Sequence, residues 1–447
     1  MDADEAREWI AGLQILGMRL GLERIRALLG ALGHPERAAP AVHVVGTNGK
    51  SSTARLAAAA LASQGLRAGA YLSPHVADWT ERVQIDGAPI GDGDFAEAAT
   101  AVRAAAEGPS LSPADPVTQF EALTGIALWS FREAGAGAMA IEAGLGGRWD
   151  ATNVLPPDAA VILTNVALEH TEFLGDTEAA IAGEKLAVCP DGSDRLVVGR
   201  LSPAARAAVD DELARRRIRA LRYGEGLTAR DEGRTVAVET PSARYAGLPL
   251  ALLGGFQRDN LARAVAGAEL VTGGPLAVEP LRPAIAGVRM PGRLEVVPGA
   301  PEVVLDGAHN PAGVEALVAE LDGARAGRGP VVAVVSALEY KDVEGMVAAL
   351  APAAALVVAT RSSHPHAAAP ARLAGLAHEA GLPAVVVDDP AAALERARHE
   401  AGPDGTVLVA GSLYLLGDLR PHVLPAEREP PARLAPARKG EGPPERI

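Results

Sequence analysis

Short, continuous apolar segments rich in Val, Ile and Ala recur along the chain, and each is followed by a longer stretch rich in Ala, Leu and Arg. Continuous rather than alternating apolar character indicates strands that are buried on both faces, as in a parallel sheet between layers of helices. The pattern therefore predicts an α/β fold. The expected strands of a first group are Val42–Gly46, Ala68–Leu72, Ala138–Glu142, Ala159–Val166 and Arg195–Gly199.

A second group of apolar segments, nearer the C-terminus, predicts a second α/β domain. Its expected strands are Glu302–Leu305, Val331–Ser336, Ala355–Thr360, Ala384–Val387 and Thr406–Gly411. Between residues 219 and 253 the segments are shorter and are typical of small antiparallel strands. Pro291-Gly292 separates the two groups and predicts a turn or linker. We expect domains at 1–293 and 294–420, followed by a Pro-rich, disordered tail at 421–447.

The charge and cysteine content of the chain argue against several classes of function. The net charge is −14, which opposes binding to nucleic acid or to an anionic membrane, because both require basic surfaces. The single cysteine, Cys189, cannot form an internal disulfide or a multi-cysteine zinc site. The N-terminal segment lacks the pattern of a signal peptide, and no uncharged stretch reaches the ~20 residues that span a bilayer. We expect a monomeric, cytoplasmic protein.

A glycine-rich segment between an expected strand and an expected helix is typical of a phosphate-binding loop. In Gly46-Thr47-Asn48-Gly49-Lys50-Ser51-Ser52, the glycines let backbone N–H groups and the helix N-terminus face a polyphosphate. Lys50 would reach the β- and γ-phosphates, and a following hydroxyl would approach Mg²⁺. The usual first glycine of the pattern is replaced by Val44, and Gly46 makes the bend. An ordinary strand-to-helix turn is the alternative interpretation.

Two further residues follow expected strands of the first group. Glu142 ends the strand Ala138–Glu142, and His170 follows the strand Ala159–Val166. Ligands of open α/β sheets bind at the carboxyl ends of the strands, and Mg²⁺ prefers oxygen donors that it shares with substrate phosphates. Glu142 is therefore a candidate Mg²⁺ ligand. A solvated loop glutamate and a surface histidine at a helix start are the alternatives.

Six more segments carry a family resemblance. They are Leu72–His75 with Thr80–Val83, Ile141–Arg148, Asp150–Asn153, Leu168–Thr171, Met290–Arg293 and Asp306–Pro311. With the Gly46–Lys50 form of the phosphate loop, and in this order, they make the chain resemble the folylpolyglutamate synthase and dihydrofolate synthase branch of the Mur-type amide ligases. The resemblance extends from about Gly21 to Gly417.

This resemblance implies both a fold and an activity. The implied fold is an N-terminal, P-loop-containing ATPase domain of the Mur-ligase type and a smaller, Rossmann-like C-terminal domain of the glutamate-ligase type. The implied activity is an ADP-forming ligation of L-glutamate to dihydropteroate, to the terminal glutamate of folates, or to both, through an acyl phosphate. Its cofactors would be ATP and Mg²⁺ at two sites, and its partners are small molecules.

Three alternatives to the bifunctional enzyme stay open. The nearest is a synthase with only the polyglutamylating activity. A cell-wall Mur-type ligase fits less well, because the Ser73-Pro74-His75 and Trp149-Asp150 segments match the folate branch. A nucleotide-binding regulator that has lost catalysis is the third, and the presence of Glu142, His170 and Lys185 argues against it.

The resemblance also implies roles for individual residues in nucleotide binding and catalysis. Ser73 and Glu142 would hold the magnesium ion of the nucleotide, and His170 a second divalent ion. Lys185, carbamylated by CO₂, would help to bind that second ion, although Leu186-Ala187-Val188 departs from the family's small Ala-Gly pair. The expected catalytic residues are Lys50, Glu142, His170 and Lys185. The expected ATP contacts are Gly46, Thr47, Asn48, Gly49, Lys50, Ser51, Ser52, Asn260, Arg293 and Asp306.

On the substrate side, the resemblance implies a pterin site at Thr118, Gln119, Phe120, Glu121, Trp149, Asp150 and Ala151. Ring faces of Phe120 and Trp149 suit a flat heterocycle, and Asp150 can accept from its N–H groups; a packing role for Phe120 is equally compatible with the sequence. His309 and Asn310 are assigned to the site without a specific role. Asn260 is equally suited, on local grounds, to cap the helix from Leu261. Tyr340 departs from the family's Asp-Lys-Asp pattern and leaves the role of that loop open.

Overall fold

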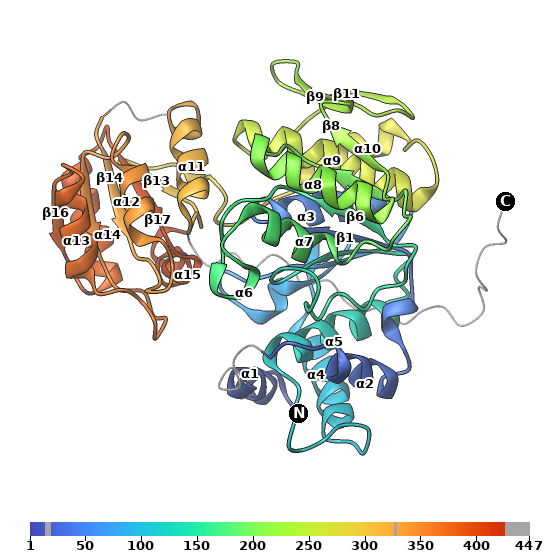
Figure 1. The fold of residues 1–447 in the computed structure, drawn as a ribbon. Helices are drawn as coiled ribbons and strands as arrows, with labels where there is room; N and C mark the ends of the chain where they lie inside the picture. The colour runs from blue at the N-terminus through green and yellow to red at the C-terminus, as the bar shows by residue number, and fades with distance from the viewer. Residues whose placement is uncertain (14–18, 326–328, 425–447) are drawn as a thin grey trace.

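The computed structural model describes residues 1–13, 19–325 and 329–424. Two units, each built on one sheet, lie side by side (Figure 1). Ten predicted strands are present with bounds that differ by at most a few residues, and the predicted α/β class is confirmed. The last helix, α15 (Leu413–Val423), includes the first three residues of the predicted tail, and the rest of that tail, from 425, lies outside the described residues.

The larger unit contains an 11-stranded sheet in the order β11-β10-β9-β8-β7-β6-β1-β5-β2-β3-β4. Strands β2, β5, β1, β6, β7 and β8 pair in parallel. In the region from 219 to 253, β9, β10 and β11 pair antiparallel as predicted, whereas β8 is parallel to both β7 and β9. Strands β3 and β4 extend the other edge antiparallel. The strands are β1 (Ala41–Val45), β2 (Ala68–Tyr71), β3 (Val83–Ile85), β4 (Ala88–Pro89), β5 (Ala138–Glu142), β6 (Ala160–Leu163), β7 (Leu196–Val198), β8 (Ala220–Tyr223), β9 (Gly226–Asp231), β10 (Val236–Glu239) and β11 (Arg244–Leu248).

Helices cover both faces of the large sheet because alternate residues of its central strands point to opposite sides. Val42 and Val44 of β1 pack with α3 and α9 on one face, whereas Ala41 packs with α2 and α5 on the other. The helices of this unit are α1 (Ala3–Gly12), α2 (Glu23–Ala31), α3 (Lys50–Ala62), α4 (Asp92–Ala106), α5 (Gln119–Glu133), α6 (Thr171–Leu174), α7 (Glu178–Leu186), α8 (Pro203–Arg216), α9 (Gly255–Thr272) and α10 (Val278–Gly287), with 3-10 turns η2 (Pro35–Arg37) and η3 (Trp79–Arg82).

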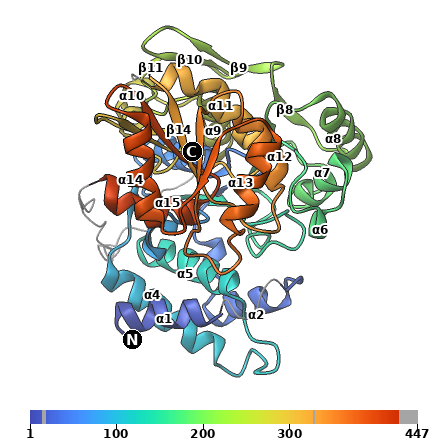
Figure 2. The same ribbon diagram turned by 90° about the vertical axis from the view of Figure 1, so that its left-hand side faces the viewer.

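The smaller unit has a six-stranded sheet in the order β12-β13-β17-β14-β15-β16, parallel except for β12. It starts at Glu295, close to the expected boundary at 293/294, which remains a prediction. Figure 2 shows α12 to α15 of this unit in front of the large sheet. Its elements are β12 (Glu295–Val297), β13 (Glu302–Leu305), α11 (Pro311–Ala324), β14 (Val331–Val335), α12 (Val343–Leu350), β15 (Leu356–Ala359), α13 (Pro370–Glu379), β16 (Ala384–Val386), α14 (Pro390–Ala401), β17 (Thr406–Ala410) and α15.

Within residues 1–13, 19–325 and 329–424, no helix is both long enough and apolar enough to cross a bilayer.

Candidate active site

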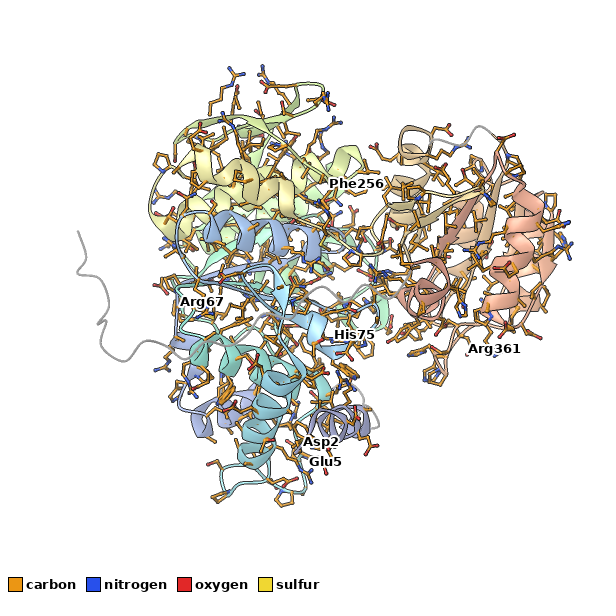
Figure 3. All side chains as sticks on the ribbon, turned by 180° about the vertical axis from the view of Figure 1, so that it is seen from behind. Asp2, Glu5, Arg67, His75, Phe256 and Arg361 are labelled. Atoms are coloured by element: carbon orange, nitrogen blue, oxygen red, sulfur yellow. The ribbon has the colours of Figure 1, made fainter. Side chains whose placement is uncertain are left out.

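A cavity of about 490 Å³ lies where the two units meet. The phosphate loop and the start of α9 line it from the large unit, and the loops after β13, β14 and β17 line it from the small unit. In the view from behind, Phe256 at the start of α9 lies on the side that faces the small unit (Figure 3). The carboxyl ends of parallel strands in both sheets therefore open onto one cleft, as expected for open α/β sheets.

The phosphate loop is held in a tight bend that two glycines make possible. Gly46 has φ 147°, and a Cβ atom there would lie 1.9 Å from the Oγ1 of Thr164. Gly49 has φ 79°, and a Cβ atom would lie 2.7 Å from the Oδ1 of Asn260. The backbone N–H of Asn48 donates to the Oδ1 of Asn165 at 2.8 Å. These positions exclude any larger side chain, which explains the glycines.

Lys50 begins α3, directly after this bend. Its Nζ donates to the backbone oxygens of Gly46 at 3.1 Å and Thr47 at 2.9 Å, so the ammonium group lies against the loop. An ammonium group in this place lies where a polyphosphate on the loop would need neutralisation.

Glu142 is the last residue of β5 and contacts the phosphate loop. It is 1% exposed, its Oε1 accepts from the Oγ of Ser51 at 2.9 Å, and its Oε2 accepts from the backbone N–H of Ser73 at 2.9 Å. Burial raises the pKa of Glu142, and the charge of Lys50 opposes that shift. The solvated-loop interpretation is wrong for this residue, because the parallel strands on both sides bury the end of β5.

Lys185 lies in the last turn of α7 with its side chain 2% exposed. Its Nζ donates to the backbone oxygen of Gly46 at 2.8 Å. Burial, together with the charge of Lys50, lowers the pKa of Lys185 to about 7. A solvated helix lysine is therefore excluded, and near neutral pH a large share of this amine is unprotonated.

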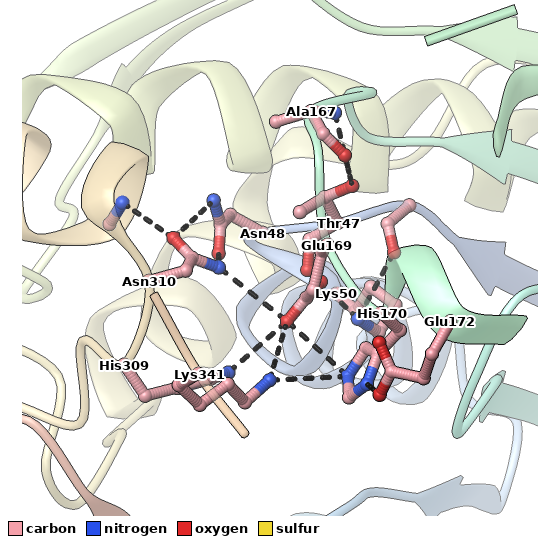
Figure 4. Close-up of polar contacts among 12 residues, drawn as sticks. Thr47, Asn48, Lys50, Ala167, Glu169, His170, Glu172, His309, Asn310 and Lys341 are labelled. Carbon is pink, nitrogen blue, oxygen red and sulfur yellow. Dashed lines mark hydrogen bonds and ion pairs between the residues drawn. The ribbon is translucent and has the colours of Figure 1, made fainter. Parts of the chain in front are cut away.

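A cluster of charged groups joins the two units beside the phosphate loop (Figure 4). The Oε1 of Glu169 lies 3.4 Å from the Nζ of Lys341 and 3.4 Å from the Nε2 of His309. His170 is the residue before α6, and its Nε2 lies 3.3 Å from the Nζ of Lys341. Burial, with the charge of Lys341, lowers the pKa of His170 to about 4, so its imidazole is neutral.

Asn310 connects this cluster to the phosphate loop. It caps α11 through its Oδ1, and its Nδ2 donates to the Oδ1 of Asn48 at 3.2 Å. Asn310 is absent from the residues that line the cavity, whereas its neighbour His309 lines it. His309 is oriented by a 2.8 Å contact between its Nδ1 and the backbone oxygen of Gly307.

The predicted nucleotide contacts outside the loop, Asn260, Arg293 and Asp306, also line this cavity. Asn260 is buried in the second turn of α9, where its Oδ1 accepts from the Oγ1 of Thr53 at 3.3 Å. Because α9 begins at Gly255, the alternative in which Asn260 caps this helix is wrong. Asp306 accepts from the backbone N–H groups of Leu294 and Ala308, and Arg293 lines the cavity beside it.

A second cavity, of about 390 Å³, adjoins the first. The two share Ser73, Pro74 and the Gly144–Gly146 turn. The seven predicted pterin-site residues all line the second cavity: Thr118, Gln119, Phe120, Glu121, Trp149, Asp150 and Ala151. The structure thus brings two separate sequence regions to one cavity next to the phosphate loop.

Several of these pterin-site side chains also have structural contacts. Thr118 and Glu121 form the capping box of α5, and Glu121 also pairs with Arg24 at 3.1 Å. Asp150 accepts from the backbone N–H groups of Leu145 at 2.8 Å and Thr152 at 2.9 Å. Much of the hydrogen-bonding capacity of these carboxylates is therefore used within the protein.

Comparisons with known proteins show which sequences and structures this chain is similar to. Residues 292–413 match the family model "Mur ligase, glutamate ligase domain". The chain is 34% identical over 410 residues to a folylpolyglutamate synthase of Lacticaseibacillus casei, covering 90% of this chain and 94% of that protein. It is 31% identical to a dihydrofolate synthase/folylpolyglutamate synthase of Bacillus subtilis, covering 93% and 98%.

The chain belongs to the folylpolyglutamate synthase and dihydrofolate synthase family. Another relative, a probable bifunctional folylpolyglutamate synthase/dihydropteroate synthase of Haloferax volcanii, is 37% identical over 94% of this chain, which spans only 50% of that longer protein. The folylpolyglutamate synthase of Mycobacterium tuberculosis with ADP superposes with a TM-score of 0.87 at 31% identity, covering 96% of this chain and 100% of that one. The Escherichia coli FolC in complex with DHPP and ADP gives 0.83 at 28%, covering 94% and 97%.

Glu169 and Lys341 of this family member were not among the predicted site residues. Both belong to segments that the sequence had singled out, Leu168–Thr171 and the loop after Leu338. Nothing local distinguishes either from a surface charge, because their burial depends on the other unit. Only the cleft between the two sheets shows that they meet.

Proposed function

We propose that this enzyme joins L-glutamate to dihydropteroate and to the terminal glutamate of folates, converting ATP to ADP and phosphate. The observation that carries the proposal is the contact between two cavities at Ser73 and Gly144–Gly146, one on the phosphate loop and one beside Phe120 and Trp149. An acceptor whose ring lies in the smaller cavity can extend its carboxylate toward a γ-phosphate on the loop. The E. coli relative solved with both DHPP and ADP supports this pairing of ligands.

The proposed reaction has two steps. A carboxylate oxygen of the acceptor attacks the γ-phosphorus of ATP, the bond to the β–γ bridging oxygen breaks, and ADP leaves with that electron pair. The amine of glutamate then attacks the acyl carbon and loses a proton, and phosphate leaves. Lys50 and Arg293 stabilise the charge on the transferring group, and closure of the cleft holds the reactants together.

The residues beside the phosphate loop fit Mg²⁺. A buried carboxylate, Glu142, already contacts the Ser51 hydroxyl and lies next to Ser73, and Mg²⁺ takes one or two such protein oxygens while phosphates and water complete its shell. In the described part of the chain, no three His, Cys, Asp or Glu side chains cluster as a metal site. Bound there, Mg²⁺ would neutralise charge on the phosphates.

For a second ion, we propose His170 together with a carbamate on Lys185. The unprotonated Nζ of Lys185 would attack CO₂, form an N–C bond and release a proton, which replaces a cation with an anion. The low pKa and the burial of Lys185 support this step, because only the neutral amine reacts and water is excluded. The neutral imidazole of His170 has a lone pair for a metal ion.

The test of the proposed function is ADP release by the purified protein with ATP, Mg²⁺ and L-glutamate. Dihydropteroate and tetrahydrofolate are supplied in separate reactions, and ADP is expected with each. If ADP forms with tetrahydrofolate but not with dihydropteroate, the enzyme is a monofunctional folylpolyglutamate synthase. The L. casei relative carries that name. Lys50→Ala should abolish release without a change in melting temperature, and no ADP with either acceptor would contradict the proposal.

We also propose that the enzyme acts as a monomer in the cytoplasm, as the sequence predicts. Light scattering coupled to gel filtration tests the oligomeric state.

A further inference from the structure

Arg82 is a buried cation at the junction of the substrate cavity and the loop that follows β2. It is the last residue of η3 and is 9% exposed. Its side chain lines the smaller cavity together with Ser73 and Pro74, which also line the nucleotide cavity. The segment Thr80–Val83 is one of the family motifs of the sequence, and the proposed function above gives Arg82 no role.

Neutral groups hold the guanidinium of Arg82 in place. Its Nε donates to the Nδ1 of His75 at 2.9 Å, and its Cζ lies 5.0 Å from the ring centroid of Trp79. His75 and Trp79 contact each other edge to face at 4.4 Å. Burial and the charge of Arg82 lower the pKa of His75 to about 3, so this imidazole is a neutral acceptor. His75 lies on the side of the large unit near the small one (Figure 3).

The carboxylates near Arg82 are engaged elsewhere. Glu81, its neighbour in η3, accepts from the backbone N–H groups of Val76, Ala77 and Asp78. Glu142 interacts with Arg82 only through longer-range charge, because its own oxygens accept from Ser51 and Ser73. Among residues 1–13, 19–325 and 329–424, Arg82 forms no ion pair, and its two terminal nitrogens have no hydrogen-bond partner.

A buried cation without a counter-ion is costly, since burial disfavours its charged form. Burial indeed lowers the pKa of Arg82. The planar fork of five N–H donors suits a carboxylate or a phosphate and is fixed here before any ligand arrives. An anionic ligand that enters the smaller cavity would satisfy the two terminal nitrogens and remove this cost.

We propose that Arg82 binds the reacting carboxylate of the acceptor substrate and orients it toward the γ-phosphate on the phosphate loop. This inference rests on the proposed function and adds a residue that contacts the substrate. The acceptor is the favoured anion, because Arg82 lines the smaller cavity and is not among the residues that line the nucleotide cavity. His75 and Trp79 are positioning residues for the guanidinium.

The test compares two probes of nearly the same shape: dihydropteroate and the analogue in which its carboxylate is a neutral carboxamide. Their dissociation constants are measured calorimetrically in the presence of ADP and Mg²⁺. The wild-type protein is expected to bind the carboxylate about tenfold or more tightly than the amide, because a charged hydrogen bond is lost. Arg82→Gln should bind both probes equally, and Arg82→Lys should show an intermediate preference.

Arg103→Gln is the matched control, since Arg103 lies on the surface of α4 and pairs with Glu107. It should keep the full preference for the carboxylate. The KM for ATP should stay within about twofold in Arg82→Gln, whereas the KM for dihydropteroate should rise at least about tenfold. An unchanged carboxylate preference in Arg82→Gln, or a loss confined to ATP affinity, would overturn the inference.

His75→Phe keeps the cation but removes its acceptor, so it provides a second variant if Arg82→Gln fails to fold. A partial loss of the carboxylate preference is expected, and an unaltered preference would count against the positioning role. The binding measurement is independent of turnover. If the wild-type protein prefers the carboxylate through Arg82 but releases no ADP, the proposed function fails and the anion site stands.

Discussion

The Nζ of Lys341 in the small unit lies 3.4 Å from the Oε1 of Glu169 in the large unit. Both side chains are largely buried, at 11% and 7% exposed. Burial alone would raise the pKa of Glu169, but the hydrogen bond from His309 and the charges of Lys50 and Lys341 hold it well below its usual range. This pair therefore links the two sheets across the cleft in which ATP is expected to bind.

We expect Lys341→Met to reduce kcat by about tenfold or more. The variant loses the contact with Glu169 that stabilises the closed cleft, and a loss of ~1.4 kcal/mol lowers a rate tenfold. The KM for ATP should change less, since the loop contacts of Lys50 remain. Steady-state ADP release measures both constants. Glu339→Gln, an exposed change in the same loop, is the control, and equal kcat values for the two variants would contradict a linking role for Lys341.

Glu142→Gln should increase the Mg²⁺ concentration required for half-maximal activity by about 10- to 100-fold. The amide keeps the size of the side chain but loses the negative charge that a divalent cation requires. A titration of activity with Mg²⁺ at saturating ATP measures this shift. The control is Glu107→Gln, an exposed residue at the C-cap of α4. An unaltered Mg²⁺ dependence would remove Glu142 from the proposed metal site.

Activity should depend on CO₂ if Lys185 is carbamylated. The pKa of Lys185 is lowered to about 7, so its neutral fraction decreases as the pH falls below 7, and carbamate formation decreases with it. We expect CO₂-depleted enzyme to lose activity and to regain it with bicarbonate, with a greater bicarbonate requirement at pH 6 than at pH 8. Mass spectrometry and ¹³C spectra with labelled bicarbonate detect the adduct directly. Full activity and no adduct in CO₂-free buffer would rule it out.

His43 should make folding stability sensitive to acid. It is buried in β1, its Nε2 lies 2.8 Å from the Oγ1 of Thr152, and burial lowers its pKa to about 4. Below pH 6.5 the unfolded chain binds a proton at this position while the folded chain does not, so unfolding becomes more favourable until about pH 4. The full effect is about 3 kcal/mol.

Urea unfolding at several pH values measures this contribution. The free energy of unfolding of His43→Val should fall less steeply between pH 7 and pH 4 than that of the wild-type protein. Thr152 keeps its hydrogen bond to Asp150 in this variant. Parallel pH profiles for the two proteins would show that His43 does not titrate as its burial implies.

The order of the strands along the chain and the phosphate loop were predictable because their signals are contiguous. A buried parallel strand such as β5 (Ala138–Glu142) is a local run of apolar residues, and the sequence predicts its bounds without error. The segment Gly46–Ser52 contains the glycine bend, the Lys50 cation and the serine hydroxyls within seven residues. The antiparallel extension at β3 and β4 carries no such run, since these strands are only three and two residues long.

The local sequence patterns thus predict two α/β units, a phosphate loop and a set of candidate residues at strand ends. The tertiary structure decided which of those residues meet, because burial and charge pairing depend on segments far apart along the chain. Glu169 and Lys341 are separated by 172 positions, and the sequence around each predicts an exposed charged side chain. Arg82 follows Glu81 in the sequence, yet Glu81 accepts from backbone N–H groups. Within the part of the chain that the structure describes, the fold leaves the Arg82 cation without an ion pair beside the substrate cavity.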